Sequence, residues 1–342
     1  MKNKHQIKNM EALKQKIKQL LPRIIMYYYY LYTAKKEINF DIRRRVHDKV
    51  YNDSENEKVQ RDLTVAYHIV EKCLTMPEPL PGSGKKVVIG LCNKILQYEK
   101  MNLSLNGLEF KQSVSVIAEY HEFHKKIGFK LDEDVNEKVE NIVNKFKFVV
   151  GVKQKYITNE EYFKDINEPF DVFCSSRHSV RNYTAEEIPL PVLYECIDMA
   201  QESPSFCNRQ PTRIQIIKST QLKTNILELQ NGNRGFGHLA DTLLVITSVI
   251  STTKDIHERN ENHLNGGMFL MTLLYALHFK KIGTCLLNWS VSNDKDVKLR
   301  KLLNTPENEV ILMIISCGYI PEKIALASSP RKSAKDITIE SL

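Results

Sequence analysis

The feature that most limits the possible folds of this chain is an alternation of strand and helix patterns in its second half. Short apolar or alternating runs, typical of strands, are separated by longer runs with helical periodicity. The predicted strands are 213–218, 241–250, 284–290 and 308–320, the last being the final strand. The predicted helices are 189–203, 220–232, 261–283 and 293–304, with Gly232 and Gly283 as stop signals. This order predicts an α+β or α/β core.

The first half of the chain has a different pattern. Residues 1–165 are mostly helical in periodicity, with few strand-like segments. We expect the first helix to be interrupted at Pro22 and the Pro/Gly-rich stretch 77–84 to be a rigid connector. The sequence therefore predicts a helical N-terminal extension over 1–165 and a sheet-containing domain over 170–342.

The stretch LLPRIIMYYYYLYTA, residues 20–34, is the most apolar segment near the N-terminus. It is too short to span a bilayer and contains Arg23. We expect a buried or groove-facing helix. The alternative is an interfacial segment that docks on a membrane or a protein partner, with its tyrosines at the boundary with water.

Composition and charge exclude several classes. The 342 residues are 42% hydrophobic and 26% charged, which is globular rather than disordered. The seven cysteines are widely spaced without CxxC, so neither a disulfide framework nor a zinc site is expected. These cysteines, with an N-terminus too charged for a secretory signal, predict a cytoplasmic protein. The net charge of +8 is too diffuse to predict a nucleic-acid partner but suits anionic ligands.

Two short motifs resemble ligand sites but fail on inspection. GSGKK, residues 82–86, has Pro79 where a phosphate loop needs glycine, and we expect an ordinary turn. HEFH places His121 and His124 on one helix face, but no further ligand cluster accompanies them. We expect both to be solvated and predict no metal site. No GxGxxG fingerprint or GxSxG nucleophile elbow is present.

SSRHSVRNY, residues 175–183, is more informative. Arg177, Ser179 and Arg181 occupy alternate positions and therefore project to the same side of an extended chain. Two guanidinium groups and a hydroxyl on one side suit a phosphate. A solvated strand face would show the same alternation. The downstream sequence therefore has to distinguish a phosphate-binding segment from a solvated strand.

That downstream sequence resembles the nitroreductase family of FMN-dependent oxidoreductases. RHSVR, a helix, PSFCNRQP and a strand follow one another as in the family, whose motifs are Arg-(Arg/His)-Ser-x-(Arg/Lys) and Pro-Ser-x-x-Asn-x-Gln-Pro. The central strand, long helix, last core strand and the basic tail SSPRKS also match in order, over residues 170–335. The resemblance implies a nitroreductase-like α+β fold with a central mixed, mainly antiparallel sheet flanked by helices.

The resemblance also implies a cofactor site at a homodimer interface. Arg177, Ser179 and Arg181 would bind the FMN phosphate end, helped by Arg331. The loop 203–212 would come from the partner subunit and lie by the isoalloxazine. Its polar contacts would be Asn208 and Gln210, with Ser205 and Phe206 near the ring, and LLNW (286–289) would pass the ring's other side.

Two further arginines, Arg209 and Arg234, are candidate substrate-binding residues that the family motifs do not specify. Arg209 stands where many relatives have a small or polar residue; it would favour the anionic reduced flavin, bind an acidic substrate, or point to solvent. Arg234 lies in the glycine-rich stretch 231–238. That stretch is either a flexible turn or a loop over the flavin or substrate, where glycine permits close backbone approach.

The implied activity is flavin chemistry, in which NAD(P)H reduces FMN and the flavin passes electrons to an unidentified acceptor. No single residue is expected to be catalytic. The stretch around 68–84 is similar to a helical extension of bacterial nitroreductase-like proteins of polysaccharide or cell-surface biosynthesis. The alternative is a redox-inactive binding or scaffold protein that acts through its helical N-terminal domain.

Overall fold

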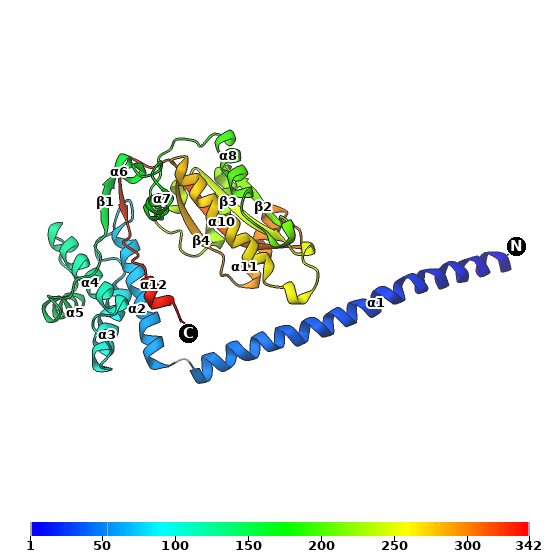
Figure 1. Ribbon diagram of the computed structural model, residues 1–342, viewed down its shortest axis with the longest axis horizontal. Coiled ribbons are helices and arrows are strands. Elements are labelled where there is room, and N and C mark those ends of the chain that lie inside the picture. The colour runs from blue at the N-terminus through cyan, green and yellow to red at the C-terminus, as the bar shows by residue number, and fades with distance from the viewer. Residues whose placement is uncertain (1, 53, 341–342) are drawn as a thin grey trace. The chain divides into compact units, whose positions relative to one another are not determined.

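The computed structural model describes the backbone of residues 2–52 and 54–340 and the side chains of residues 22–50 and 54–340 (Figure 1). The chain divides into two compact units. Met1–Asp53 and Ser251–Glu261 form the first unit, and Ser54–Ile250 and Asn262–Leu342 form the second.

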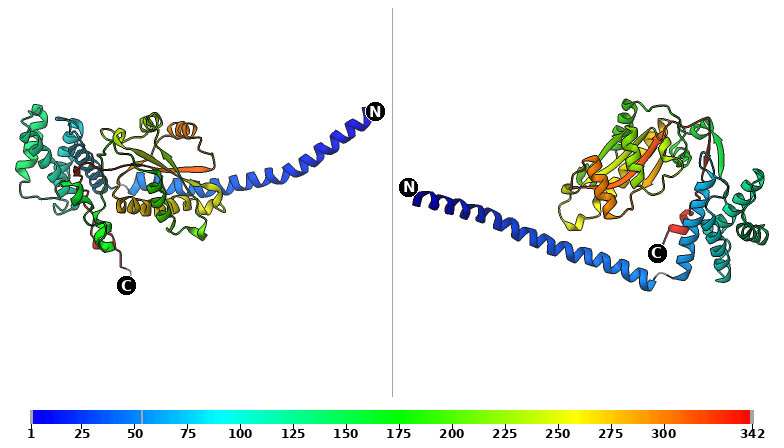
Figure 2. Two further views of the ribbon diagram at one scale, coloured as in Figure 1. Left: turned by 90° about the horizontal axis from the view of Figure 1, so that it is seen from above. Right: turned by 180° about the vertical axis from the view of Figure 1, so that it is seen from behind.

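The first unit is built on one long helix, α1 (Lys2–His47), followed by a short π-helix, η1 (Asp48–Asn52) (Figure 2). Segment 251–261 contains the 3₁₀ turn η5 (Ile256–Glu258). Arg259 in this segment donates to both carboxylate oxygens of Asp41, at 2.7 and 3.0 Å. This paired contact joins the C-terminal part of α1 to segment 251–261.

Two sequence predictions for α1 are wrong. The helix runs through Pro22 instead of being interrupted there, because a proline removes one backbone hydrogen bond while the turns on both sides keep theirs. Residues 22–30 and Tyr32 are exposed rather than buried, with Tyr28 at 64% and Tyr32 at 70%. The contacts of the first unit lie further along α1, around Glu37 and Asp41.

The second unit begins with four helices that share one core. They are α2 (Glu55–Leu74), α3 (Lys85–Lys100), α4 (Leu108–Lys126) and α5 (Glu133–Lys145). α2 starts at Ser54 because the Ser54 and Glu57 side chains cap each other's backbone N–H groups. Apolar residues from every helix, including Leu63, Ile95, Ile117 and Ile142, are fully buried together.

The expectation that the helix histidines are solvated is wrong for His124. Its ring is 2% exposed and lies against the rings of Tyr120 and Phe129. Nε2 accepts the N–H of Gly82 at 2.9 Å, and Nδ1 lies 2.8 Å from the carbonyl oxygen of Tyr120. Both ring nitrogens therefore stabilise the connector and the helix.

The sheet of the second unit is antiparallel throughout, in the order β2 (Thr212–Ile217), β3 (Thr242–Val249), β5 (Glu309–Gly318), β4 (Gly283–Asn288). One face packs against α8 (Leu190–Gln201) and α10 (Glu261–Phe279), and the other against α9 (Thr220–Leu229) and α11 (Asn293–Leu303). Leu244 and Ile246 of β3 face the first layer, and Leu243 and Val245 face the second. This is the expected α+β class.

Three details of the sequence prediction need correction. Strand 308–320 is not the last, because β6 (Lys323–Leu326) follows and pairs with β1 (Lys155–Thr158). α10 ends at Phe279 rather than Gly283; Lys281 takes a φ of +58°, and Gly283 begins β4. α9 ends at Leu229, and Gly232 lies beyond it with a φ of +109°.

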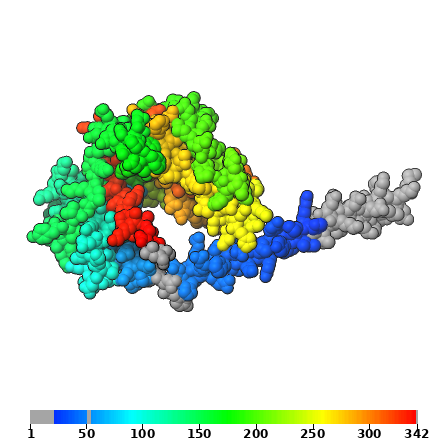
Figure 3. Space-filling view, viewed as in Figure 1, coloured from blue at the N-terminus to red at the C-terminus, as the bar shows by residue number. Residues whose placement is uncertain are grey.

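Short helices complete the second unit: α6 (Asn159–Phe163), α7 (Phe170–Ser176) and α12 (Ala334–Ile337). The C-terminal segment lies against the helical part, as the red residues show in Figure 3. Ser328 donates to Glu71 of α2 at 2.7 Å, and Lys332 pairs with Glu109 of α4 at 3.2 Å. Among the described residues, no helix is long and apolar enough to cross a membrane.

Candidate functional site

The segment 177–183 crosses one end of the sheet, which we call the Thr284 end. There Thr242 of β3 and Thr284 of β4 both pair with Cys317 of β5. Val180 donates its N–H to the carbonyl oxygen of Thr284 at 2.8 Å, and Ser179 forms a parallel bridge with Thr284. The predicted extended geometry is therefore present, attached to the edge of β4.

Two glycines make room for this segment. A Cβ atom on Gly283 would lie 2.4 Å from Cγ2 of Ile320 and 3.3 Å from Cβ of Val180. A Cβ atom on Gly318 would lie 3.0 Å from Cβ of Tyr183. A larger residue at Gly283 would press on Ile320 and Val180, and one at Gly318 would press on Tyr183, so both glycines keep room for the segment and its surroundings.

The two arginines have buried donors without partners. The side-chain Nε atoms of Arg177 and Arg181 are both buried and make no hydrogen bond. Arg181 is only 8% exposed, and its guanidinium lies 6.0 Å from the centre of the Phe236 ring. No ion pair within residues 54–340 includes either arginine. Buried guanidinium donors without partners fit an anionic ligand such as a phosphate.

The histidines nearby stay neutral at ordinary pH. Burial, and then the charge of Arg177, lowers the pKa of His278 to about 4. Burial is also the main cause of the lowered pKa of His178, whose Nδ1 lies 2.9 Å from the Ser176 carbonyl oxygen. These histidines therefore add no positive charge to the region at ordinary pH.

The loop 203–212 is folded on itself. Ser205 Oγ accepts the N–H of Gln210 at 3.1 Å, and the amide of Gln210 donates to Oδ1 of Asn208 at 2.9 Å. Cys207, Asn208 and Gln210 have φ values of +51°, +53° and +48°. Asn265 of α10 anchors the loop by accepting the Phe206 N–H, while the Phe206 ring is 41% exposed.

The loop and the arginines lie at opposite ends of the sheet. The loop leads into Thr212, which pairs with Ser248 at the far end of β3, here called the Ser248 end. Ser248 lies six positions beyond Thr242 along β3, a distance of about 20 Å. One chain therefore does not bring Ser205, Phe206, Asn208 and Gln210 next to Arg177, Ser179 and Arg181.

The remaining predicted residues are scattered. Arg331 is exposed and donates to the carbonyl oxygen of Ser329. After burial, and after the charges of Lys155 and Arg177, the charge of Arg331 contributes to the lowered pKa of His178. Arg209 lies in the loop with Nη2 3.9 Å from Cys207 Sγ. Arg234 is exposed in the stretch 231–238.

The glycine-rich stretch is closely held. Asn233 donates to the carbonyl oxygens of Leu227 and Gln230 at 2.8 and 3.0 Å. Gln230, 5% exposed, donates to the carbonyl oxygen of Asn288 at the end of β4. Lys72 of α2 also contacts this stretch. Sequence reasoning missed Lys72, since only the fold brings the end of α2 to this stretch.

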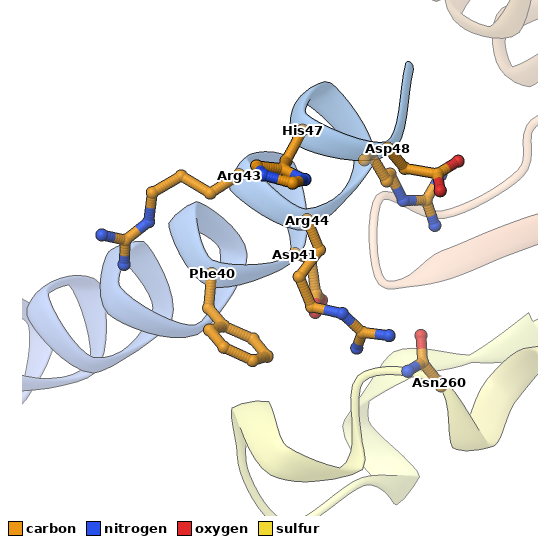
Figure 4. A pocket seen from close by; sticks show the side chains of 8 residues that line it. Phe40, Asp41, Arg43, Arg44, His47, Asp48 and Asn260 are labelled. Atoms are coloured by element: carbon orange, nitrogen blue, oxygen red, sulfur yellow. The ribbon is translucent and has the colours of Figure 1, made fainter. Parts of the chain in front are cut away.

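A separate basic pocket lies in the first unit (Figure 4). Its lining includes Arg43, Arg44, Arg45 and His47 of α1 and Asn260. Asp41 lines the same pocket and is the partner of Arg259. None of the residues predicted from sequence to bind a cofactor or substrate contributes to it.

Comparison with known proteins agrees with the sequence resemblance. The model of the nitroreductase family matches residues 174–232 and 227–319. Among curated proteins, an iodotyrosine dehalogenase 1 homolog from Caenorhabditis elegans is 24% identical over 193 residues, 47% of this chain and 58% of that protein. Iodotyrosine deiodinase from Nematostella vectensis is 22% identical over 213 residues, 54% of this chain and 79% of that protein. The match thus spans less than two thirds of the Caenorhabditis protein.

Two solved structures resemble part of this chain. An FMN-dependent nitroreductase from Clostridium difficile has 19% identity and a TM-score of 0.43, covering 50% of this chain and 98% of that one. A nitroreductase family protein from Clostridium novyi has 17% identity and a TM-score of 0.40, covering 44% of this chain and 86% of that one.

Proposed function

Because residues 174–319 form a domain of the nitroreductase family, we propose that this protein is an FMN-dependent oxidoreductase. The observation that carries the proposal is the pair of arginines whose buried Nε atoms have no partner. Family members use FMN, whose phosphate is a dianion with several acceptor oxygens. Such a group would satisfy the donors of Arg177 and Arg181 that the folded chain leaves unsatisfied.

In this proposal the residues of the chain bind and orient the cofactor. Arg177 and Arg181 hold the phosphate end with the hydroxyl of Ser179, and Arg331 adds positive charge from the tail. Bound FMN supplies hydride and electron transfer between NAD(P)H and an acceptor. The buried setting of Arg181 excludes water and so strengthens its charge interaction. A role in polysaccharide or cell-surface biosynthesis stays a prediction.

We also propose a homodimer. The loop 203–212 lies at the Ser248 end of the sheet and the arginines lie at the Thr284 end. A complete site needs both, so a partner's loop would have to supply Asn208, Gln210, Ser205 and Phe206. Residues 170–342 would then be the flavin domain and residues 1–165 its helical extension.

The test is the flavin content of the purified protein and of two variants. Wild-type protein is expected to show a flavin spectrum with about one FMN per chain. Arg177→Ala should lose the cofactor, because one charged hydrogen bond is worth about 1.5–3 kcal/mol. Arg61→Ala, at an exposed position of α2, should keep it. A wild-type protein that stays colourless after incubation with FMN would contradict the proposal and favour the scaffold alternative.

A second candidate activity comes from the curated relatives, which are named as an iodotyrosine dehalogenase 1 homolog and an iodotyrosine deiodinase. The reaction would convert 3-iodotyrosine, two electrons and a proton into tyrosine and iodide. The half-buried Arg209 and the exposed Arg234 carry guanidinium groups that would suit the carboxylate of such a substrate. The test compares three electron acceptors: iodide release from 3-iodotyrosine, reduction of a nitroaromatic compound and reduction of a quinone. The acceptor that is turned over fastest identifies the acceptor class that the protein uses.

A further inference from the structure

Lys72 of α2 reaches from the helical part of the chain to the flavin domain. Its ammonium group donates to the carbonyl oxygen of Gly232 at 2.9 Å. Gly232 has a φ of +109°, a conformation that glycine adopts readily. Just beyond the end of α2, Met76 lies against the same stretch, since a Cβ atom on Gly235 would lie 3.4 Å from the Met76 sulfur. The end of α2 and the stretch 231–238 therefore form one contact.

This contact brings a third cation within reach of the charge of Arg181. Burial, and then the positive charge of Arg181, lowers the pKa of Lys72. The thiols of Cys73 and Cys285 would offset this only when ionised, and burial raises the pKa of both, so they stay neutral at ordinary pH. Lys72, like Arg177 and Arg181, is in none of the ion pairs between residues 54 and 340.

Such a group of half-buried and buried cations is unfavourable without an anion. The hydrogen bond to Gly232 uses one of the three donors of the ammonium group and leaves two. Phe236, from the same stretch, lies beside the Arg181 guanidinium. Lys72 and Arg181 thus approach the stretch 231–238 from two different elements.

We propose that Lys72 is a further cofactor-binding residue, which binds the phosphate of FMN together with Arg177 and Arg181. The inference rests on the proposed flavin function and extends it: the helical part completes the cofactor site. A phosphate dianion between the three cations would remove their mutual repulsion and satisfy the donors that the protein leaves free.

The test compares FMN with riboflavin, which has the same ring but no phosphate. Full-length protein freed of flavin is titrated with each compound, and flavin fluorescence gives the dissociation constant. Lys72→Met should weaken FMN binding about tenfold or more, and Lys72→Arg should retain most of the affinity. Riboflavin binding should change much less. Lys58→Met, in the same helix but paired with Glu55, is the matched control.

A purely structural role for Lys72 would give a different result. Loss of its hydrogen bond to Gly232 alone would weaken FMN and riboflavin equally, and that outcome would overturn the phosphate assignment. FMN affinity within twofold of wild type in Lys72→Met would overturn the inference while leaving the flavin function intact. A wild-type protein that binds neither compound would overturn both.

Discussion

Gly283 and Gly318 lie where the segment 177–183 crosses the Thr284 end of the sheet. We expect Gly283→Ala to destabilise the protein by about 1–3 kcal/mol, the usual cost of adding a methyl group to a packed interior. The added atom would meet Ile320 and Val180, whose branched side chains have little freedom to move. Urea unfolding followed by the fluorescence of Trp289, the single tryptophan, measures the change.

Gly90→Ala is the matched control for this prediction. Gly90 lies in α3, and a Cβ atom there would meet nothing within 4 Å. This substitution should stabilise the helix by about 0.5–1 kcal/mol, because alanine loses less backbone entropy than glycine. Equal effects of the two substitutions would show that close packing at Gly283 is not what holds the segment.

The residues of the candidate site differ in how far sequence could predict them. Arg177, Ser179 and Arg181 share one short extended segment, so their common side follows from the alternation of side chains along it. Lys72 precedes Arg181 by more than a hundred residues, and no local pattern connects the two. Only the packing of α2 against the stretch 231–238 makes Lys72 a candidate.

At the scale of elements, Glu71 links three segments of the second unit. Its buried carboxylate accepts hydrogen bonds from Gln112 of α4 at 2.9 Å and from Ser328 of the C-terminal segment at 2.7 Å. Burial alone would raise the pKa of Glu71. His68, Ser328 and Gln112 together outweigh burial and hold this pKa below its ordinary value of 4.5. The ionised form is therefore the one that the fold favours.

This direction gives a pH-dependent prediction. A carboxyl with a lowered pKa in the folded state adds stability above its unfolded pKa, and the contribution disappears as the pH falls through the folded pKa. Glu71→Gln should therefore cost about 1–3 kcal/mol at pH 7 and progressively less below pH 4.5. Unfolding free energies between pH 3 and 7, in about one-unit steps, measure this. Glu140→Gln, at an exposed site on α5, should show no such trend.

The elements with strong periodicity could be predicted from the sequence. Strands that form only because they pair with a segment far away in the sequence could not. Strands β2, β3, β4 and β5 are long apolar or alternating runs, and all were found within a few residues of their predicted bounds. β1 and β6 have four residues each and exist only because they pair across the chain. The tyrosines between Tyr27 and Tyr32 are exposed. Whether such side chains are buried depends on a surface elsewhere that packs against them, and the periodicity of the helix carries no information on that surface.

At the scale of the whole molecule, the proposed site combines the arginines at the Thr284 end of one chain with the loop 203–212 at the Ser248 end of its partner. Because each chain would supply one part, two variants with different defects can test the homodimer by complementation. Arg177→Ala removes the phosphate contact, and a triple substitution of Phe206, Asn208 and Gln210 by alanine removes the loop contacts. Either variant alone should bind little FMN. When the two are co-expressed, a mixed dimer has one site with both defects and one site with none, so roughly a quarter of all sites should regain FMN.

The size of this recovery separates a shared site from a site within one chain. If Arg177 and the loop of the same chain formed the site, every site in a mixed dimer would keep one defect and co-expression would restore nothing. Tandem affinity tags on the two variants isolate the mixed dimer, in which about half of the sites should then hold FMN. Absence of FMN from that dimer would mean that the Ser248 end of a partner does not complete the site at the Thr284 end.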